Sequence, residues 1–502
     1  MRKVGYVWLK EKFGIETLDY WITSYVRDKG NPKTVERDGY IQEIHRAAAW
    51  PGDTWHDHLE FALKREGLHM ELLYLLMPKL PWDELIEYIT ATPTGRYTRI
   101  VWYLYEAITW NTLPIDDLTV GNYAPLLDSS VYLTAKPKKI RRQRIDDNLL
   151  GSINFSPMVR HGDLDLKQLN FNLRRQCNDV VSKFPASIYQ RAVNYLYAKE
   201  SKSSYAIERE TPSAQHARQF INLLERAWQD DFLNMEGLVE LQNAIVDPRF
   251  RNDGYRDTID EQIYIGETIA PGNERIHYAA PKPEDVAVMM REFIACSRKI
   301  LADKSIPDIT AAAIISYLFN YIHPFSDGNG RIHRFLMHHV LAKREFGPKG
   351  IILPVSAVIL NRPKDYDMSL ESFSQILMDK ISYDLDDRLR MTIRGETINH
   401  YRFIDCSKLN AIFHDFVQQT IESELPAEIE YLQRHDKCRV ELRTIVDLPD
   451  RIAELFIKCC IQNAGILSKN KRQLPEFAEL TDTEITELER IVSKNFLETS
   501  PS

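Results

Sequence analysis

The residues with the clearest chemistry stand together between His323 and Arg334, in the sequence HPFSDGNGRIHR. The ordinary pKa of a histidine such as His323 suits proton transfer near neutral pH. Asp327 offers the hard oxygen ligand that Mg²⁺ takes beside substrate phosphates. Arg331 and Arg334 are three residues apart, so on a helix they share one face and both can bind phosphate oxygens. The segment is therefore a candidate site for a nucleotide phosphate.

Two helices must hold this segment, one ending before it and one beginning inside it. Residues 308–322 (DITAAAIISYLFNYI) are apolar nearly throughout, which predicts a helix buried in a core. His323 precedes a proline and is biased away from helical backbone, while Gly328 and Gly330 accept positive φ. Residues 331–346 then repeat apolar side chains at helical spacing. The turn thus opens a helix N-terminus, where unpaired N–H groups and the helix dipole favour an anion.

The segment resembles the signature of the Fic family (filamentation induced by cyclic AMP), His-Pro-Phe-x-(Asp/Glu)-Gly-Asn-Gly-Arg-x-x-Arg, and matches every specified position. Members of this family mostly transfer AMP from ATP to a hydroxyl side chain of a protein. The resemblance implies that His323 is the base for that hydroxyl and that Asp327 binds Mg²⁺. It also implies that nucleotide binding involves Phe325, Gly328, Asn329, Gly330, Arg331 and Arg334, with Arg334 at the terminal phosphate.

Segments on both sides of the signature extend the resemblance. Residues 261–266 and 275–279 are short β-prone runs around a Pro-Gly-Asn turn, and they resemble the family's flap hairpin. In the family this flap, here near residues 261–279, pairs with an extended segment of the target protein. Asn361 and Tyr366 stand in a stretch that resembles the lining of the nucleotide base pocket. Without the family, the two runs predict an ordinary surface hairpin.

A second pattern, near residues 200–210, bears on regulation. Ser204 and Glu208 occupy the defining positions of the family's inhibitory helix, (Ser/Thr)-x-x-x-Glu-(Gly/Asn), whereas Arg209 departs from it. The resemblance implies an ion pair between Glu208 and Arg334, which would keep this arginine from the terminal phosphate of ATP. By itself the pattern predicts a solvated glutamate on an amphipathic helix. Together with the complete signature, it favours the inhibitory role.

Length and composition limit the rest of the molecule. At 502 residues the chain has room for about three domains with ample core. A formal charge of −8 argues against broad nucleic-acid or anionic-membrane binding. No apolar run of ~18 residues appears, and six scattered cysteines without a C-x-x-C pair are typical of reduced, buried thiols. These features predict a cytoplasmic protein that is neither secreted nor membrane-spanning.

We expect a mainly α fold in three parts, with a Fic-type helical core and a β-hairpin flap. Residues 1–190 are an N-terminal helical region of unknown role, helical from residue 1 to about 110. Residues 191–394 are the Fic catalytic core. Residues 395–502 are a C-terminal helical domain, for which a winged-helix-like module is one alternative. Packing against the core or a second subunit is the favoured role of this domain, because its last 53 residues contain more acids than bases.

Residues 135–144 (AKPKKIRRQR) form the densest basic cluster. Aromatic residues are not interleaved with these charges, which favours an exposed linker or loop over a nucleic-acid site. A P-loop is excluded because no lysine follows Gly330. A zinc protease is excluded because His333, His338 and His339 lack the His-Glu-x-x-His spacing.

These observations predict an autoinhibited protein AMPylator with ATP as co-substrate and Mg²⁺ as metal. Its partner is a protein that bears a hydroxyl side chain, and both self-modification and a homo-oligomer are left open. One alternative is a Fic-fold enzyme that transfers another phosphate-containing group or removes AMP. An alternative of a different class is a non-catalytic Fic-fold binding module. The complete set of base, metal ligand and anion cradle disfavours the latter.

Overall fold

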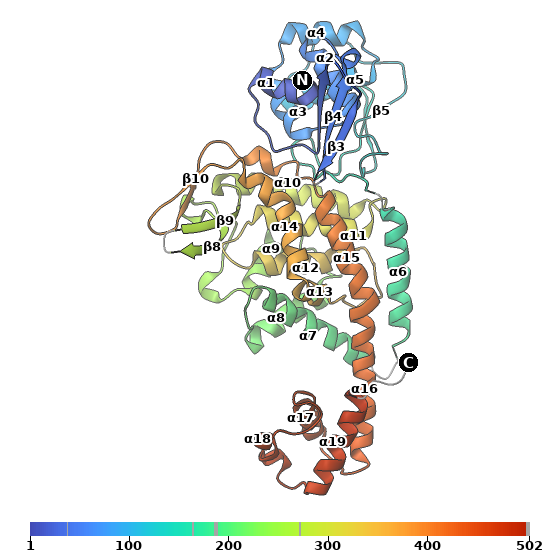
Figure 1. Cartoon of the computed structure of the whole chain (residues 1–502), viewed down its shortest axis with the longest axis vertical. Coiled ribbons are helices and arrows are strands. Elements are labelled where there is room, and N and C mark those ends of the chain that lie inside the picture. The colour runs from blue at the N-terminus through green and yellow to red at the C-terminus, as the bar shows by residue number, and fades with distance from the viewer. Residues whose placement is uncertain (38, 163–164, 185–188, 271–272, 498–502) are drawn as a thin grey trace.

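The computed structural model describes residues 1–37, 39–162, 165–184, 189–270 and 273–497. Three hydrophobic clusters follow one another along the long axis of the molecule (Figure 1). An N-terminal unit lies at one end, a helical body lies in the centre, and a small helical unit lies at the other end. The predicted mainly α class, with a helical core and a β-hairpin, is confirmed. The predicted domain boundaries near residues 190 and 394 stay a prediction.

The N-terminal unit combines helices with a four-stranded sheet, so the expectation of helix from residue 1 to about 110 is wrong. The sheet has the order β1-β2-β4-β3, in which only β2 and β4 are parallel. Buried and partly exposed residues alternate along β2, which is the period of a strand and not of a helix. The elements are β1 (Arg2–Lys3), α1 (Gly5–Phe13), β2 (Ile22–Arg27), β3 (Lys33–Arg37), β4 (Tyr40–Arg46), α2 (Trp55–Arg65), α3 (Met70–Leu76), α4 (Trp82–Ala91) and α5 (Arg96–Thr109).

The basic cluster at residues 135–144 is a strand and turn of this unit, where a linker or loop was expected. Here β6 (Lys138–Ile140) pairs with β7 (Ile145–Asp147), which also pairs with β5 (Ala124–Pro125). Arg142 forms ion pairs with Glu106 (Nε–Oε2, 3.0 Å) and with Asp117. Carboxylates of the same unit therefore neutralise part of the cluster.

The central body is built around α11 (Asp308–Ile322), in which every residue is buried, as the sequence predicts. It packs against α12 (Asn329–Lys343). The earlier helix α7 (Tyr189–Ile207) also contacts α12, although the two are far apart in the sequence. The remaining helices of this body are α6 (Leu166–Ser182), α8 (Ala214–Arg226), α9 (Met235–Ile245), α10 (Pro283–Ala302), α13 (Val355–Asn361), α14 (Pro363–Met378) and α15 (Ser407–Gln419).

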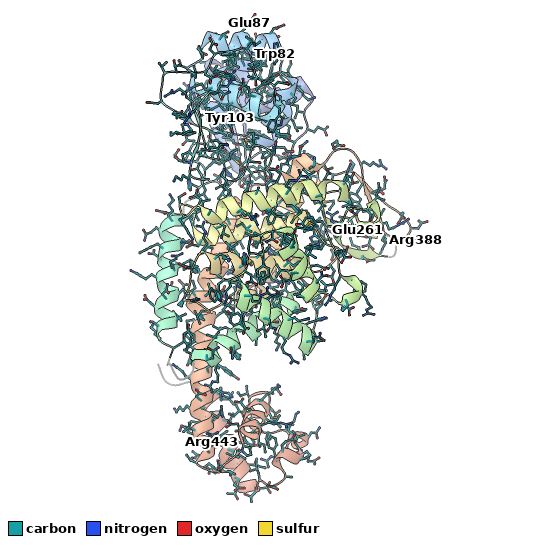
Figure 2. The ribbon with its side chains drawn as sticks, turned by 180° about the vertical axis from the view of Figure 1, so that it is seen from behind. Trp82, Glu87, Tyr103, Glu261, Arg388 and Arg443 are labelled. Atoms are coloured by element: carbon teal, nitrogen blue, oxygen red, sulfur yellow. The ribbon has the colours of Figure 1, made fainter. Side chains whose placement is uncertain are left out.

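Two hairpins project from one side of the central body. The predicted flap is the antiparallel pair β8 (Tyr264–Ala270) and β9 (Asn273–Ala279), and its predicted Pro-Gly turn lies outside the described residues. The second hairpin, β10 (Tyr383–Leu385) and β11 (Met391–Ile393), was not predicted. Figure 2 shows Glu261, at the foot of the flap, and Arg388, in the second hairpin's turn, on the same side of the molecule.

The C-terminal unit is carried by one long helix. A π-type turn at residues 420–424 joins α15 to α16 (Leu425–Arg443), which runs from the central body into the small unit (Figure 1). The unit is completed by α17 (Asp450–Ile461), α18 (Lys469–Arg472) and α19 (Asp482–Phe496). Within residues 395–497 the structure contains helices and no strand, so the hairpin of the winged-helix alternative is not found there.

Candidate active site

The predicted site is a tight loop between α11 and α12. His323 ends α11 in left-handed backbone (φ 52°, ψ 59°), and Gly328 caps α12 with φ 87°. A Cβ at position 328 would lie 2.8 Å from Cγ2 of Val246, so both the backbone angle and the contact require glycine. The loop therefore turns the chain sharply and places His323 beside the first turn of α12.

The His323 imidazole is oriented by the helix that precedes it. Its Nδ1 lies 3.1 Å from the carbonyl oxygen of Asn320, which can only accept, so Nδ1 carries the proton and Nε2 is free to act as a base. Burial lowers the pKa of His323 to about 4, while the hydrogen bond to Asn320 acts in the opposite direction. The ring is therefore neutral at physiological pH.

Two polar side chains brace the loop internally. The Asn329 amide accepts from Phe325 N (3.1 Å) and donates to Phe325 O (2.7 Å), so it closes the loop on itself. Oδ1 of Asp327 accepts from Gly328 N (2.6 Å) and lies 3.0 Å from Nη2 of Arg331. The Asp327 side chain is 46% exposed, which leaves this carboxylate accessible to a hydrated cation.

Arg334 is buried and held by the end of α7. Its Nε donates to Ser204 Oγ (2.8 Å), and its Nη2 donates to Ser204 O (2.8 Å) and to Glu208 Oε1 (2.7 Å). The predicted ion pair between Glu208 and Arg334 is thus present. Because the Arg334 side chain is 1% exposed and that of Glu208 is 25% exposed, the pair is largely shielded from solvent.

Glu208 also reaches Arg331, which the sequence did not predict. Its Oε2 lies 2.8 Å from Arg331 Nε. The two groups form an ion pair, but the Nε–H bond does not point at the carboxylate, so they form no hydrogen bond. Glu210 Oε2 lies 3.3 Å from Arg331 Nη1, and the guanidinium carbon lies 5.2 Å from the centre of the Tyr205 ring. One carboxylate therefore bridges both arginines, with Glu210 and Tyr205 as unpredicted neighbours.

The close approach of Glu208 depends on the backbone of both partners. A Cβ at Gly330 would clash with Glu208 Oε1, so a larger residue there would displace the carboxylate from the start of α12. On the other side, α7 ends at Ile207, and Arg209 takes φ 60° to turn the chain after Glu208. Gly or Asn, which the pattern quoted above specifies at this position, would tolerate this left-handed backbone better than arginine does.

The structure brings most of the predicted site residues together. Tyr366 is buried beside Arg334, and although burial raises the pKa of its hydroxyl, the guanidinium partly offsets this. Asn361 is exposed at the end of α13 and forms no hydrogen bond with the other site residues that the structure describes. Its placement in a base pocket stays a prediction.

A buried arginine that the sequence did not single out lies behind the loop. Arg256 is 1% exposed and donates to the carbonyl oxygens of Ile322, His323 and Pro324. Its sequence context, Gly254-Tyr255-Arg256, carries no signal of charge pairing or ligand binding that would have identified it.

The histidines of α12 are enclosed by the fold and have structural partners: His338 Nε2 lies 2.8 Å from Glu200 Oε1, and His339 Nδ1 lies 2.7 Å from Ala227 O. His333, His338 and His339 are all buried, and burial lowers the pKa of His333 to about 3 and that of His339 to about 4. Among the residues that the structure describes, no group of three or more His, Cys, Asp or Glu side chains could hold a metal ion. A Mg²⁺ ion bound by Asp327 would therefore take its other ligands from substrate phosphates and water, as Mg²⁺ commonly does.

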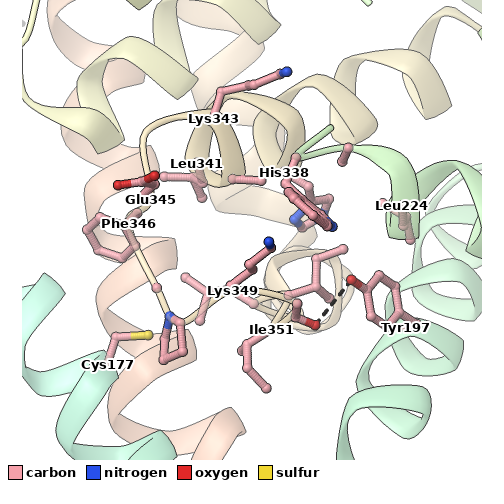
Figure 3. A pocket seen from close by; sticks show the side chains of 18 residues that line it. Cys177, Tyr197, Leu224, His338, Leu341, Lys343, Glu345, Phe346, Lys349 and Ile351 are labelled. Carbon is pink, nitrogen blue, oxygen red and sulfur yellow. Dashed lines mark hydrogen bonds between the residues drawn. The ribbon is translucent and has the colours of Figure 1, made fainter. Parts of the chain in front are cut away.

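A cavity of about 410 Å³ lies elsewhere, between α7, α8, α12 and the segment that follows α12 (Figure 3). Lys349 points into it, with Nζ 3.7 Å from the centre of the Trp228 ring. None of the predicted site residues lines this cavity. The candidate active site is defined by the loop after α11 and not by this space.

Residues 232–341 match the model of the Fic/DOC family, so the chain contains a Fic domain, and the whole signature lies within it. "Protein adenylyltransferase Fic" of Culex quinquefasciatus is 31% identical over 125 residues, which are 24% of this chain and 22% of that relative. The protein of the same name from Aedes aegypti is 29% identical over 126 residues, again 24% and 22% of the two chains. The match thus spans about a fifth of each relative's length.

A Fic family protein from Desulfovibrio desulfuricans G20 superposes with a TM-score of 0.36 at 19% identity, over 62% of this chain and 83% of that chain. All six cysteines are free and buried, as expected. Among the described residues, no helix is long and apolar enough to cross a membrane.

Proposed function

We propose that this chain is a protein adenylyltransferase that moves AMP from ATP to a hydroxyl side chain of a target protein. The observation that carries the proposal is the geometry around His323. A neutral imidazole with a free Nε2 stands beside a glycine-rich helix N-terminus that presents two arginines on one face. The matched Fic family and the names of the relatives support the same reaction.

The chemistry assigns one role to each group. Nε2 of His323 takes the proton of the target hydroxyl while its oxygen attacks the α-phosphorus of ATP. A bond forms between that oxygen and the α-phosphorus, the bond to the bridging oxygen breaks, and pyrophosphate leaves. The N–H groups at the start of α12, together with Arg331 and Arg334, are placed to bind the phosphates. As the resemblance to the Fic signature implies, we assign Arg334 to the terminal phosphate.

Mg²⁺ would be held by Asp327, and when bound it neutralises charge that builds up on the phosphates. The ion pair between Asp327 and Arg331 fits this role, since it holds the carboxylate beside an arginine that is placed to bind phosphate. The flap formed by β8 and β9 would align the target, because an extended peptide can add to a hairpin by backbone hydrogen bonds.

Glu208 would inhibit the reaction. Its carboxylate occupies both arginines at once, so the terminal phosphate of ATP and the carboxylate compete for the same guanidinium groups. ATP that binds with Glu208 in place would lack this contact and lie in an unproductive position. Basal transfer is therefore expected to be low.

Labelling with ATP that carries a tag on its α-phosphate or base tests the proposal, using a cell lysate as the source of targets. Four forms are compared: the intact chain, Glu208→Gly, His323→Ala and the double variant. We expect Glu208→Gly to raise labelling of the chain itself or of a target, and His323→Ala to lower it by ~10²–10⁴-fold. ATP binding should survive in His323→Ala, because other groups hold the phosphates.

The same experiment separates the alternatives. A chain that binds ATP·Mg²⁺ but labels nothing in either the intact or the Glu208→Gly form is the non-catalytic binding module. Label that appears with a tagged phosphate-containing donor other than ATP indicates another transferred group. Loss of AMP from a labelled target on addition of the intact chain indicates AMP removal.

A further inference from the structure

We infer that Arg256 is the positioning residue of the reaction, holding the His323 backbone and ring where the imidazole can act. This inference rests on the proposed function, in which His323 is the base. Arg256 lies between α9 and the flap, 67 residues before His323, and its contacts join three separate segments of the site.

The contacts of Arg256 converge on the turn that carries His323. Its Nε donates to His323 O (2.8 Å), and its backbone N–H donates to Pro324 O (2.9 Å). Its Nη2 donates to Ile322 O (3.3 Å) and to Pro281 O (2.6 Å), at the end of the flap. Three successive carbonyl groups of the turn are therefore fixed by one residue, which also ties the turn to the base of the flap.

The backbone of His323 needs such a restraint. Left-handed φ and ψ are disfavoured for any residue with a Cβ, and the proline that follows narrows the choices further. An extended conformation would relieve this strain but would swing the imidazole away from α12. The hydrogen bond from Arg256 to the His323 carbonyl stabilises the left-handed backbone of His323. The strained conformation that sets the direction of the imidazole is therefore maintained.

The charge of Arg256 acts on the same histidine. Among the described residues Arg256 forms no ion pair, and the carbonyl oxygens at the negative end of the α11 dipole solvate it instead. The charged or titratable groups that act on the ring are Arg256 and Asp327, with His333 nearby. After burial, the Arg256 guanidinium contributes to keeping the pKa of His323 low, and Asp327 opposes it.

The simpler interpretation is that Arg256 only stabilises the fold. Arg344 is the control, because it is also buried and also donates to three carbonyl oxygens, those of Ile300, Asp303 and Ile306. It differs from Arg256 in a long ion pair, with Nε 3.9 Å from Asp308 Oδ1. These carbonyls lie outside the site. A purely structural role would make substitutions at both arginines alike.

The test uses the full chain with Arg256→Gln, Arg256→Lys and Arg344→Lys, each in the intact and the Glu208→Gly form. NMR of ¹³C-labelled histidine gives the pKa of His323, with His323→Ala to assign its signal. We expect Arg256→Gln to raise that pKa, because a nearby positive charge is lost. Arg256→Lys should keep the low pKa, since it keeps the charge. Both variants should lower kcat by ~10²-fold with an unchanged KM for ATP, because the lysine cannot hold several carbonyls at once.

Three results would overturn the inference. The first is an unchanged pKa of His323 in Arg256→Gln. The second is a fall in kcat in Arg344→Lys as large as that in Arg256→Lys. The third is a rise in KM at constant kcat.

Should no form of the chain label any protein, the proposed function fails, yet the pKa of His323 still decides whether Arg256 controls that ring. ATP binding and the melting temperature of each variant show which ones are folded.

Discussion

At the scale of single residues, the low pKa of His323 has a direct kinetic consequence. A general base must be neutral to accept a proton, and burial keeps the folded-state pKa near 4, well below the value of ~6.5 of a free histidine. Protonation therefore removes activity only at low pH. The low pKa keeps the imidazole neutral and available to the hydroxyl nucleophile, but it also makes the imidazole a weaker base than a free histidine.

We accordingly expect kcat/KM to stay level as the pH falls through 6.5, over the range in which the chain stays folded, because the folded-state pKa of His323 lies near 4. The measurement is the pH profile of labelling by the Glu208→Gly chain, since kcat/KM reports groups of the free enzyme. An acid limb centred near 6.5 would contradict the assignment of a buried, neutral His323.

Residue chemistry was also the part of the site that the sequence predicted best. The signature from His323 to Arg334 is local, so its turn, its two helices and its shared arginine face follow from spacing alone. The sequence did not predict that Glu208 also pairs with Arg331. Whether a carboxylate reaches one arginine or two depends on how α7 lies across α12, and that is set by packing between elements far apart in the chain.

At the scale of elements, the end of α7 carries a strain that can be tested. Arg209 is exposed, forms no ion pair among the described residues, and has φ 60°. Left-handed backbone costs a residue with a Cβ roughly 1–2 kcal/mol, whereas glycine accepts it freely. The turn that follows Glu208, and with it the inhibitory position of Glu208, is thus less stable here than in a chain with Gly or Asn at residue 209.

Arg209→Gly should therefore stabilise the position in which Glu208 pairs with the two arginines. A gain of ~1 kcal/mol would lower basal labelling by about fivefold. Arg209→Ala is the matched control, because it removes the cation but keeps the Cβ and the strain. We expect the alanine variant to label like the intact chain. If both variants lower labelling equally, competition between the Arg209 cation and Arg334 for Glu208 explains the departure, and backbone strain does not.

Strands were harder to predict than helices. The sequence predicted α11 with its bounds, whereas β2 to β4 were mistaken for helix. Strands of five to seven residues give only a few alternations, and in β2 the pattern includes the polar residue Ser24, buried at 0% exposure. The pairing of β2 with β4 depends on contacts that no local pattern records.

At the scale of the whole molecule, several buried histidines make stability depend on pH. Burial lowers the pKa of each to about 3 or 4, and the group comprises His58, His69, His323, His333, His339 and His414. In the unfolded chain these residues titrate near ~6.5. Between 6.5 and 4 the unfolded state binds more protons than the folded state, so the free energy of unfolding decreases as the pH falls.

We expect this loss to begin below pH 6.5, at up to ~1.4 kcal/mol per pH unit for each such histidine. Urea midpoints measured across this range check it. His339→Gln should reduce the slope, whereas the exposed His161→Gln should leave it unchanged. A midpoint that is flat down to pH 5 would show that the buried rings are protonated in the folded protein.

The separate hydrophobic clusters predict independent unfolding of the C-terminal unit. Among the described residues its cluster meets the central one along α16, whose first half packs in the centre and whose second half packs in the small unit. Phe456 is fully buried there and stacks edge-on against Phe477 at 5.4 Å between ring centres. Phe456→Ala should cost the unit ~3–5 kcal/mol. Because none of these contacts reaches the loop after α11, the active site should not be affected.

Calorimetry of Phe456→Ala should therefore show an early transition of the C-terminal unit, while ATP binding and labelling stay at the level of the intact chain. The control is Phe319→Ala in α11, a residue equally buried but within the central cluster. That change should lower the main transition and weaken ATP binding together, because α11 sets the position of His323. A single transition in Phe456→Ala, shifted as a whole and accompanied by loss of ATP binding, would mean that α16 couples the two units into one cooperative body.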